Sequence, residues 1–141
     1  CPQNIGQISR SNFDKHFKIN VHNDDGRKEF IINNIGKIIK DYYKNLFCCD
    51  YLLWVYHNAE GYNYKLFNKE DKIKYPFRNN KFSFSRHINK ELVDESYSQV
   101  KWESSSTVKY NGVAIGEFQF HNNKNIINFR FYMKSLLNYF S

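Results

Sequence analysis

Cysteine is scarce in this chain of 141 residues, and its placement excludes two kinds of small-protein scaffold. Cys1, Cys48 and Cys49 are odd in number and include an adjacent pair, which argues against a framework of disulfide bonds. No two of them have the Cys-x-x-Cys spacing, so a structural zinc site is not expected. A reducing compartment fits this usage best, and we expect a cytoplasmic location.

Proline, glycine and long apolar runs are also in short supply. Two prolines and six glycines in a chain that is 18% aromatic are not typical of a disordered or low-complexity protein. The chain has no run of about 18 apolar residues, so no membrane span is predicted. Its start also lacks the apolar stretch of a signal peptide. We expect one domain over residues 1–141, and a first residue other than Met indicates a fragment of a longer chain.

Acidic residues are outnumbered, and the net charge is +7. This excess favours a polyanionic partner, because each phosphate neutralised by Lys or Arg releases condensed counterions. The alternative is that the positive charge only keeps the protein soluble. Residues 69–86 interleave basic residues with Tyr, Phe and Asn, so we predict that Lys81 and Arg86 contact nucleic-acid phosphates.

Hydrophobic periodicity predicts the elements of the first part of the chain. Residues 16–22 alternate between apolar and polar side chains, which indicates a half-buried strand, and residues 23–26 predict a turn. Residues 27–47 carry an apolar stripe at helical spacing and predict one long helix. Glu29, in the first turn of that helix, is either a partner of the helix dipole or an extra active-site carboxylate.

Short alternating segments fill the middle of the chain. Residues 51–56 are mostly apolar and predict a strand buried on both faces, and residues 62–67 are expected to pair back on it as a hairpin. A polar loop is expected over residues 68–80, followed by a strand over residues 81–86. Residues 88–96 predict one or two helical turns.

The most informative segment is residues 108–121, which predict two short strands joined at Asn111-Gly112. Asn-Gly is a strong hairpin signal, because a type I′ turn needs two residues that tolerate positive φ. On the second strand Glu117 and Gln119 lie two residues apart, so both project from one face, with phenylalanines on the other. A strand over residues 124–131 and a terminal helix complete a predicted α+β fold, with a mixed, mostly antiparallel sheet.

The pair Glu117-x-Gln119 after a hairpin resembles the second half-motif of the PD-(D/E)XK nuclease superfamily. It is similar to the variant found in some type II restriction endonucleases, where Gln replaces the usual Lys. Residues 115–124, followed by Phe-Arg-Phe at 129–131, look like the end of such an enzyme. The resemblance is limited to the last third of the chain and implies a restriction-endonuclease-like fold.

One element of that motif is missing. The family places an acidic residue on the preceding strand, where this chain has Thr107. Three alternatives remain open. Glu103 supplies the acid, or a carboxylate at Glu29 or at residues 94–95 reaches the site, or the domain binds nucleic acid without cutting it.

The resemblance implies a metal-dependent endonuclease that acts on DNA, with RNA as a further possible substrate. Mg²⁺ would be held by Glu117 and Glu103, and Gln119 would orient water or phosphate but could not act as a base. Lys124 and Arg130 would clamp the phosphate.

Two other classes compete with this interpretation. The aromatic strands could form a stacking platform in a binding module that does not cleave. A small basic domain is also typical of a secreted nuclease toxin. The expected partners are DNA together with a second copy or the remainder of a longer chain, and no membrane.

Overall fold

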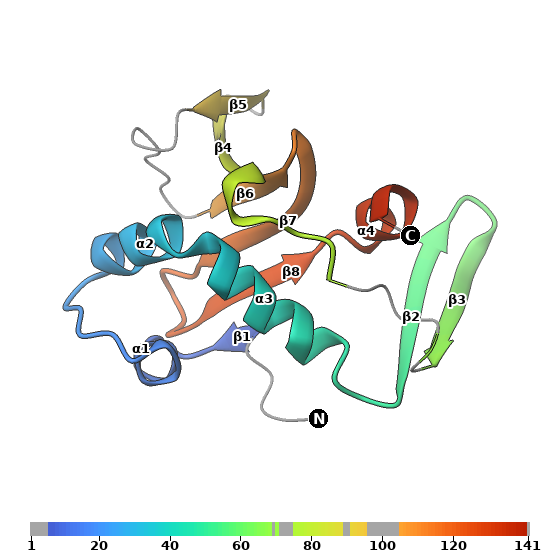
Figure 1. Cartoon of the computed structure of the whole chain (residues 1–141), viewed down its shortest axis with the longest axis horizontal. Helices are drawn as coiled ribbons and strands as arrows, with labels where there is room; N and C mark the ends of the chain where they lie inside the picture. Colours follow the sequence, from blue (N-terminus) through green and yellow to red (C-terminus); the bar gives the residue numbers. More distant parts are fainter. Residues whose placement is uncertain (1–5, 69, 71–74, 89–90, 96–104, 141) are drawn as a thin grey trace.

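The computed structural model describes residues 6–68, 70, 75–88, 91–95 and 105–140 (Figure 1). In this part of the chain one sheet has six strands in the order β1-β8-β7-β6-β4-β5, and every neighbouring pair is antiparallel. Its strands are β1 (Gln7–Ile8), β4 (Phe82–Ile88), β5 (Glu91–Glu95), β6 (Ser105–Tyr110), β7 (Val113–Phe120) and β8 (Ile127–Phe131). A second sheet pairs β2 (Tyr51–Asn58) with β3 (Gly61–Asn68).

The helices are α1 (Arg10–Phe17), α2 (Asp24–Asn33), α3 (Ile35–Leu46) and α4 (Met133–Phe140), with a short 3-10 turn, η1 (Asn79–Lys81). The α+β class and the mostly antiparallel sheet are confirmed.

The predicted long helix is two helices, α2 and α3, separated at Asn34. Asn34 has φ −128° and ψ 28°, which is outside helical geometry. The first helix also begins before residue 27, because Asn23 caps it by accepting a 2.8 Å hydrogen bond from the Gly26 backbone N–H. The apolar stripe continues across the break, so periodicity alone could not reveal it.

The strand predicted over residues 16–22 was wrong, because α1 occupies its first part. Ser9 caps α1, and Phe13 and Phe17 are buried one helical turn apart. Lys18 then ends the helix in the left-handed conformation, with φ 56°. Phe17 fits a strand period and a helix period equally well, and the pairing of Phe17 with Phe13 decides for the helix.

The hairpin at Asn111-Gly112 is confirmed. Asn111 has φ 50° and Gly112 has φ 83°, so both turn residues adopt the positive φ that the dipeptide predicted. The strands expected near residues 62–67 and 81–86 are also present, as β3 and β4. Residues 91–95 form strand β5, so the helical turns predicted over residues 88–96 were wrong.

The core lies between the six-stranded sheet and the helices that cross one of its faces (Figure 1). Tyr42 of α3 contacts the rings of Phe118 and Phe129, with centroids 5.8 and 4.6 Å apart. Lys28 of α2 places its ammonium 5.3 Å from the centre of the Phe120 ring. These contacts put α2 and α3 on the face of the sheet opposite to Glu117, since successive residues of β7 alternate between faces.

The β2–β3 hairpin forms a sheet of its own beside this core (Figure 1). A strand over residues 51–56 and its hairpin partner are confirmed, but burial on both faces was wrong. Tyr51, Leu53 and Val55 are exposed, whereas Leu52 and Trp54 are only half-buried.

Candidate functional site

A row of polar residues crosses the centre of the six-stranded sheet. Thr107 of β6, Glu117 of β7 and Arg130 of β8 lie directly opposite one another. Gln119 pairs with Asn128 of β8 in the next row on the same face. The predicted placement of Glu117 and Gln119 on one face is therefore confirmed, with the phenylalanines of β7 on the helix-covered face.

A bulge and a glycine in β7 shape the strand just before Glu117. The register shifts between Val108 and Lys109, so that Ile115 is an extra residue of β7 and is fully buried. A Cβ on Gly116 would lie 2.7 Å from both the Arg130 carbonyl oxygen and the Phe129 ring. Only glycine at this position lets β8 approach closely enough to bring Arg130 beside Glu117.

Three donors hold the Glu117 carboxylate. Gln119 donates from Nε2 to Oε1 at 2.9 Å, Arg130 donates from Nη2 to Oε2 at 3.0 Å, and the Tyr132 hydroxyl donates to Oε2 at 3.1 Å. Thr107 in turn hydrogen-bonds to Tyr132. The carboxylate is thus fixed in position by one residue of β7, one residue of β8 and Tyr132, which directly follows β8.

Burial and these donors have opposite effects on the pKa of Glu117. Burial favours the neutral acid and by itself would raise the pKa, but hydrogen bonds from Arg130, Gln119 and Tyr132 and the charge of Arg130 outweigh it. The net result is a pKa below the usual value for glutamate, so Glu117 is an anion at neutral pH. Burial first, and then the charge of Glu117, raise the pKa of Tyr132, which keeps its hydroxyl protonated as a donor.

Glu117 projects from the polar face of the sheet but is nearly buried. Its side chain is 10% exposed, whereas that of its partner Arg130 is 62% exposed. Thr107 is also buried. An anionic ligand approaching this face from solvent therefore meets the guanidinium of Arg130 first and the carboxylate behind it.

The structure brings Glu117, Gln119 and Arg130 together but separates the other predicted cations. Lys124 is exposed in the loop after β7. Lys81 ends η1, where its carbonyl accepts a 2.8 Å hydrogen bond from the Asn111 N–H. Asn111 lies in the turn that precedes β7, whereas Lys124 lies in the loop that follows it. Arg86 lies in β4, where its backbone pairs with Val93. The fold therefore does not place Lys124, Lys81 or Arg86 in contact with Glu117.

The missing acidic residue is not replaced by any other described carboxylate. Glu103 lies outside the described residues. The backbone register aligns Asp94, Ser85, Thr107 and Glu117 across four strands, which places Asp94 about 14 Å from Glu117 at ~4.8 Å a strand. Glu29 is exposed on α2, and the sheet lies between that helix and Glu117.

Sequence reasoning missed Tyr132 as part of the site. It was assigned to the terminal helix, which begins one residue later, at Met133. The available signal was alternation, because Tyr132 follows Arg130 by two positions and therefore continues its face beyond the end of β8. Thr107 had been noted for its position but not as a partner of Tyr132.

A second polar cluster fixes the loop after β7 to the helices. Arg10 binds both carboxylate oxygens of Asp24, and it also donates to the carbonyls of His121 and Lys124 at 2.8 and 3.0 Å. Arg27 bridges Asp24 and Asp14. Burial opposes ionisation of Asp24, but Arg10 and Arg27 keep its pKa below the usual value. These charges are satisfied within the cluster, which therefore serves to position the loop.

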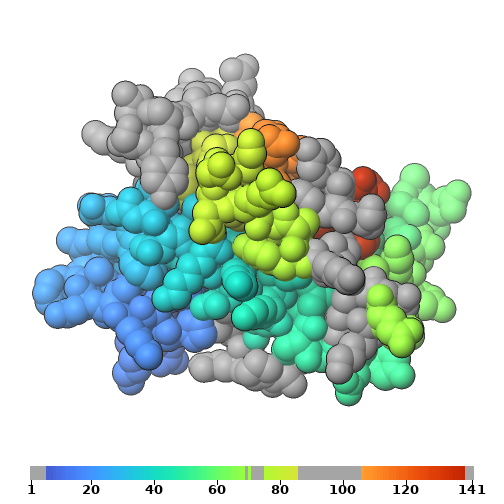
Figure 2. Space-filling model, in the orientation of Figure 1, coloured from blue at the N-terminus to red at the C-terminus, as the bar shows by residue number. Residues whose placement is uncertain are grey.

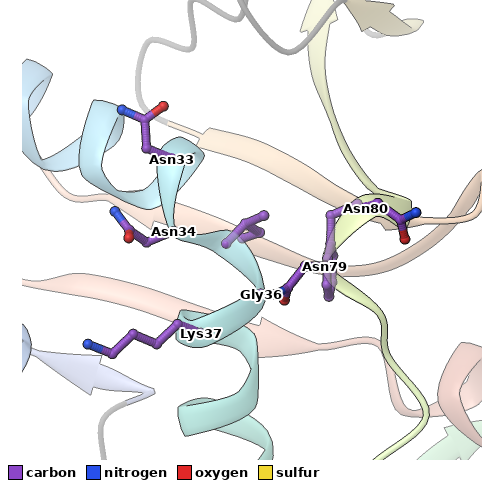
Figure 3. A pocket seen from close by; sticks show the side chains of 8 residues that line it. Asn33, Asn34, Gly36, Lys37, Asn79 and Asn80 are labelled. Carbon is purple, nitrogen blue, oxygen red and sulfur yellow. The ribbon is translucent and has the colours of Figure 1, made fainter.

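A cleft of about 470 Å³ lies where α2 meets α3, opposite η1. Figure 3 shows Asn79 pointing toward Gly36, while Asn33, Lys37 and Asn80 point in different directions. Tyr75 lies nearby and donates to the Gly36 carbonyl at 3.2 Å. The polar groups of this cleft do not converge on one point, and none of the described residues that line it is a carboxylate, so they do not form a candidate metal or catalytic site.

Within the described residues no three His, Cys, Asp or Glu side chains cluster as a ready-made metal site. No helix in that part of the chain is both long enough and apolar enough to cross a membrane.

The chain is similar to one characterised enzyme over nearly its whole length. It is 31% identical over 139 residues to the type II restriction enzyme CviAII of Paramecium bursaria Chlorella virus 1. The match covers 97% of this chain but 36% of the viral enzyme, so the chain spans about a third of the length of that relative. No model of a known protein family matches the chain. No solved structure matches it significantly. The similarity supports a restriction-endonuclease-like relationship that extends well beyond the last third of the chain.

Proposed function

We propose that this chain is the phosphodiester-hydrolysing part of a metal-dependent endonuclease that acts on DNA, with its site at Glu117. The observation that supports this most strongly is an ionised, nearly buried carboxylate in the middle of a sheet, beside an exposed arginine. The similarity to a type II restriction enzyme supports the choice of substrate. The Glu117-x-Gln119 spacing supports assignment to the PD-(D/E)XK superfamily, in its Gln variant.

The donor atoms at this site fit Mg²⁺. Glu117 offers a carboxylate, and the neighbouring Gln119 and Thr107 offer an amide and a hydroxyl oxygen, all hard ligands. Mg²⁺ commonly takes one or two carboxylates and completes its shell with water and substrate phosphate, so a single firmly placed carboxylate is sufficient to start such a site. When bound, the ion would supply Lewis-acid activation of the phosphoryl group and of water. Glu103 is the proposed second carboxylate.

The protein residues have distinct roles in this proposal. Glu117 anchors the ion, and Gln119 fixes the carboxylate through its Nε2 and orients a neighbouring water or phosphate oxygen. Tyr132 holds the other carboxylate oxygen and is itself held by Thr107. Neither Gln119 nor Tyr132 removes a proton, because one has no basic atom and the raised pKa keeps the other protonated.

Arg130 has two possible partners, and this explains its exposure. In the free protein its guanidinium pairs with Glu117, which balances the charge of a carboxylate in a largely dry environment. A DNA phosphate arriving from solvent also offers anionic oxygens, and two of them can accept parallel hydrogen bonds from a guanidinium. We propose that Arg130 turns from Glu117 to the phosphate, which would leave the Glu117 carboxylate available to hold the ion.

A DNA-binding module without cleavage is the second candidate. The observation that favours it is that the hydrogen-bond partners described for the Glu117 carboxylate are all donors, and none of these described partners is a second carboxylate. In that case the row of Thr107, Glu117 and Arg130 would read base edges or a phosphate instead of holding a metal.

The decisive experiment is incubation of the protein with plasmid DNA and with RNA, in Mg²⁺ or Mn²⁺, with and without a chelator. Cleavage of DNA that stops on chelation and is lost in Glu117→Gln supports the proposal. Glu29→Gln is the matched control, since Glu29 is exposed on the far side of the sheet. Salt-dependent DNA binding that survives chelation, with no cleavage in either metal, would establish the binding module instead.

A further inference from the structure

Amide side chains gather beside Glu117, on the same face of the six-stranded sheet. Gln7 of β1, Asn128 of β8 and Gln119 of β7 lie directly opposite one another, in the row next to that of Glu117. The two rows are two residues apart along β7, which is about 6.6 Å. The loop that joins β7 to β8 adds three exposed asparagines. We use the name amide surface for Gln7, Asn122, Asn123, Asn125 and Asn128.

The side chains of the amide surface are available to a ligand. None of them takes part in a hydrogen bond within the described part of the chain, although each amide carries two donor hydrogens and a carbonyl acceptor. Lys124 lies among the loop asparagines, and Arg130 follows Asn128 by two positions on the same face. Unused hydrogen-bonding groups and two cations therefore lie next to the site proposed for phosphate chemistry.

Arg10 fixes the backbone of this loop although the loop is exposed. Its guanidinium donates to the carbonyls of His121 and Lys124 at 2.8 and 3.0 Å, and it also binds both carboxylate oxygens of Asp24. Within the loop the Ile126 N–H donates to the Lys124 carbonyl at 2.8 Å. Exposed loops are usually mobile, whereas a loop that is held in advance loses less conformational entropy on binding. A fixed backbone with free side chains is the arrangement that a recognition loop needs.

We propose that the amide surface contacts the base edges of DNA in the major groove and so determines sequence preference. This inference rests on the function proposed for Glu117. An Asn or Gln amide matches adenine, because it donates to N7 and accepts a hydrogen bond from the N6 amino group. The amide surface should therefore favour A·T base pairs.

The position of the loop fits bases close to the phosphate at Glu117. The loop begins four residues after Glu117, which is about 13 Å at ~3.3 Å a residue. Phosphates along one DNA strand are about 3.4 Å apart in the direction of the helix axis, so this distance corresponds to about four base pairs. The bases contacted by the loop should lie within that range.

Phosphate binding alone does not account for these residues. Contacts to phosphates position a protein on DNA, whereas contacts to base edges carry the sequence information. Phosphates are neutralised by Lys and Arg, and the amide surface contains neither. We therefore assign Lys124 to the DNA backbone and the asparagines beside it to the bases.

Selection of binding sites from a pool of random duplex DNA tests this inference. A chelator is present throughout, so that DNA is bound but not cut. The wild-type chain should enrich a short sequence that contains A·T pairs. Fluorescence anisotropy at fixed salt then measures the affinity for the enriched sequence and for random DNA.

The double substitution Asn122→Ala and Asn123→Ala should lower the affinity for the enriched sequence at least about 5-fold, because each good amide–adenine pair contributes ~5- to 150-fold. The affinity for random DNA should stay the same, because no charge is removed. Lys124→Gln should instead lower both affinities alike and reduce the slope of log K against log salt by about 1.

Asn80→Ala is the matched control. Asn80 is also an exposed asparagine, but it lies in η1, in the segment that Figure 2 shows in yellow-green at the surface. This substitution should leave both affinities unchanged, and circular dichroism verifies that each variant folds.

Two outcomes would overturn the inference: a wild-type chain that enriches no sequence, and a double variant that keeps the wild-type preference. Cleavage of plasmid DNA is assayed separately, so either outcome can occur while the function proposed for Glu117 stands. Sequence preference without cleavage in Mg²⁺ or Mn²⁺ would support contact with the bases and overturn the hydrolysis alone.

Discussion

The central sheet and the β2–β3 hairpin each depart from the usual distribution of polar and apolar residues, in opposite directions. At the centre of the six-stranded sheet a glutamate is nearly buried, and its carboxylate accepts hydrogen bonds from Gln119, Arg130 and Tyr132. On the β2–β3 hairpin six large apolar residues are exposed to solvent, and these form the hairpin face: Tyr51, Leu53, Val55, Tyr62, Tyr64 and Leu66. Burying a charge is costly unless it is paired, and exposing a contiguous apolar face is unfavourable unless it is covered. Each departure points to a ligand, one hydrophilic and one hydrophobic.

The two regions also differ in how they are supported. Glu117 lies on a strand with partners on both sides and aromatic rings of α3 behind it, so its position is set by the whole fold. The hairpin pairs only with itself among the described strands. We therefore expect substitutions in the sheet to change folding and chemistry together, and substitutions on the hairpin face to have little effect on the stability of the fold.

Truncating one aromatic residue in each region gives the largest expected difference. Phe118 is fully buried and contacts Tyr42 and Phe129, so Phe118→Ala should lower the free energy of unfolding by about 3–5 kcal/mol. Tyr64→Ala should change it by less than about 0.5 kcal/mol, because Tyr64 is largely exposed. Urea denaturation at low protein concentration measures both. Equal losses would show that the hairpin is part of the cooperative core.

Removing the carboxylate of Glu117 should have an intermediate effect on stability. Glu117→Ala leaves the donors of Arg130, Tyr132 and Gln119 without their acceptor, and we expect a loss of about 1–3 kcal/mol. Glu117→Gln retains one acceptor oxygen and should lose less. Thermal unfolding of the two variants decides the point. No loss in either one would mean that the carboxylate is held for a ligand without contributing to the fold.

Lowering the pH should destabilise the six-stranded sheet, because Glu117 becomes protonated. It should not change the stability of the hairpin face, because none of its six residues is a carboxylate. The pKa of Glu117 is lowered in the folded protein. Its stabilising contribution is therefore complete above the pH at which a free glutamate ionises, about 4.3, and is lost as the pH falls through its lower folded pKa.

Comparing wild type with Glu117→Gln isolates this contribution from that of Asp24, whose pKa is also lowered. The difference in unfolding free energy between the two proteins should be constant near neutral pH and should shrink below about pH 4. A difference that grows on acidification would contradict the direction of the shift.

The sequence predicted the hairpin of β6 and β7 well, because its signals are local. Asn111 and Gly112 must accept positive φ, and the spacing of Glu117 and Gln119 determines that they share a face. The break at Asn34 was not predictable from the apolar stripe, which runs through it. Helix α1 was missed because the alternation over residues 16–22 was interpreted alone, without the capping Ser9 and the buried Phe13 that precede it.

The partners of Glu117 depend on strand order, which local pattern does not specify. Arg130 was proposed as a phosphate clamp, but its pairing with Glu117 follows from β8 lying beside β7. Exposure of the hairpin face was missed for a related reason. Tyr51, Leu53 and Val55 read as a core strand, and only the tertiary fold shows that no described layer covers them.

Arg130→Gln should change stability little but should change the site in a characteristic way. The Arg130 side chain is 62% exposed, so its ion pair with Glu117 contributes at most about 1 kcal/mol. Removing it eliminates a competitor for the carboxylate. Mn²⁺ should therefore bind about 2- to 5-fold more tightly, as measured by calorimetry without DNA. DNA cleavage should nevertheless fall, because the proposed phosphate contact is lost. Lys37→Gln removes an equal charge from an exposed position on α3 and should change neither. Weaker Mn²⁺ binding in Arg130→Gln would mean that Arg130 positions Glu117 for the metal instead of competing with it.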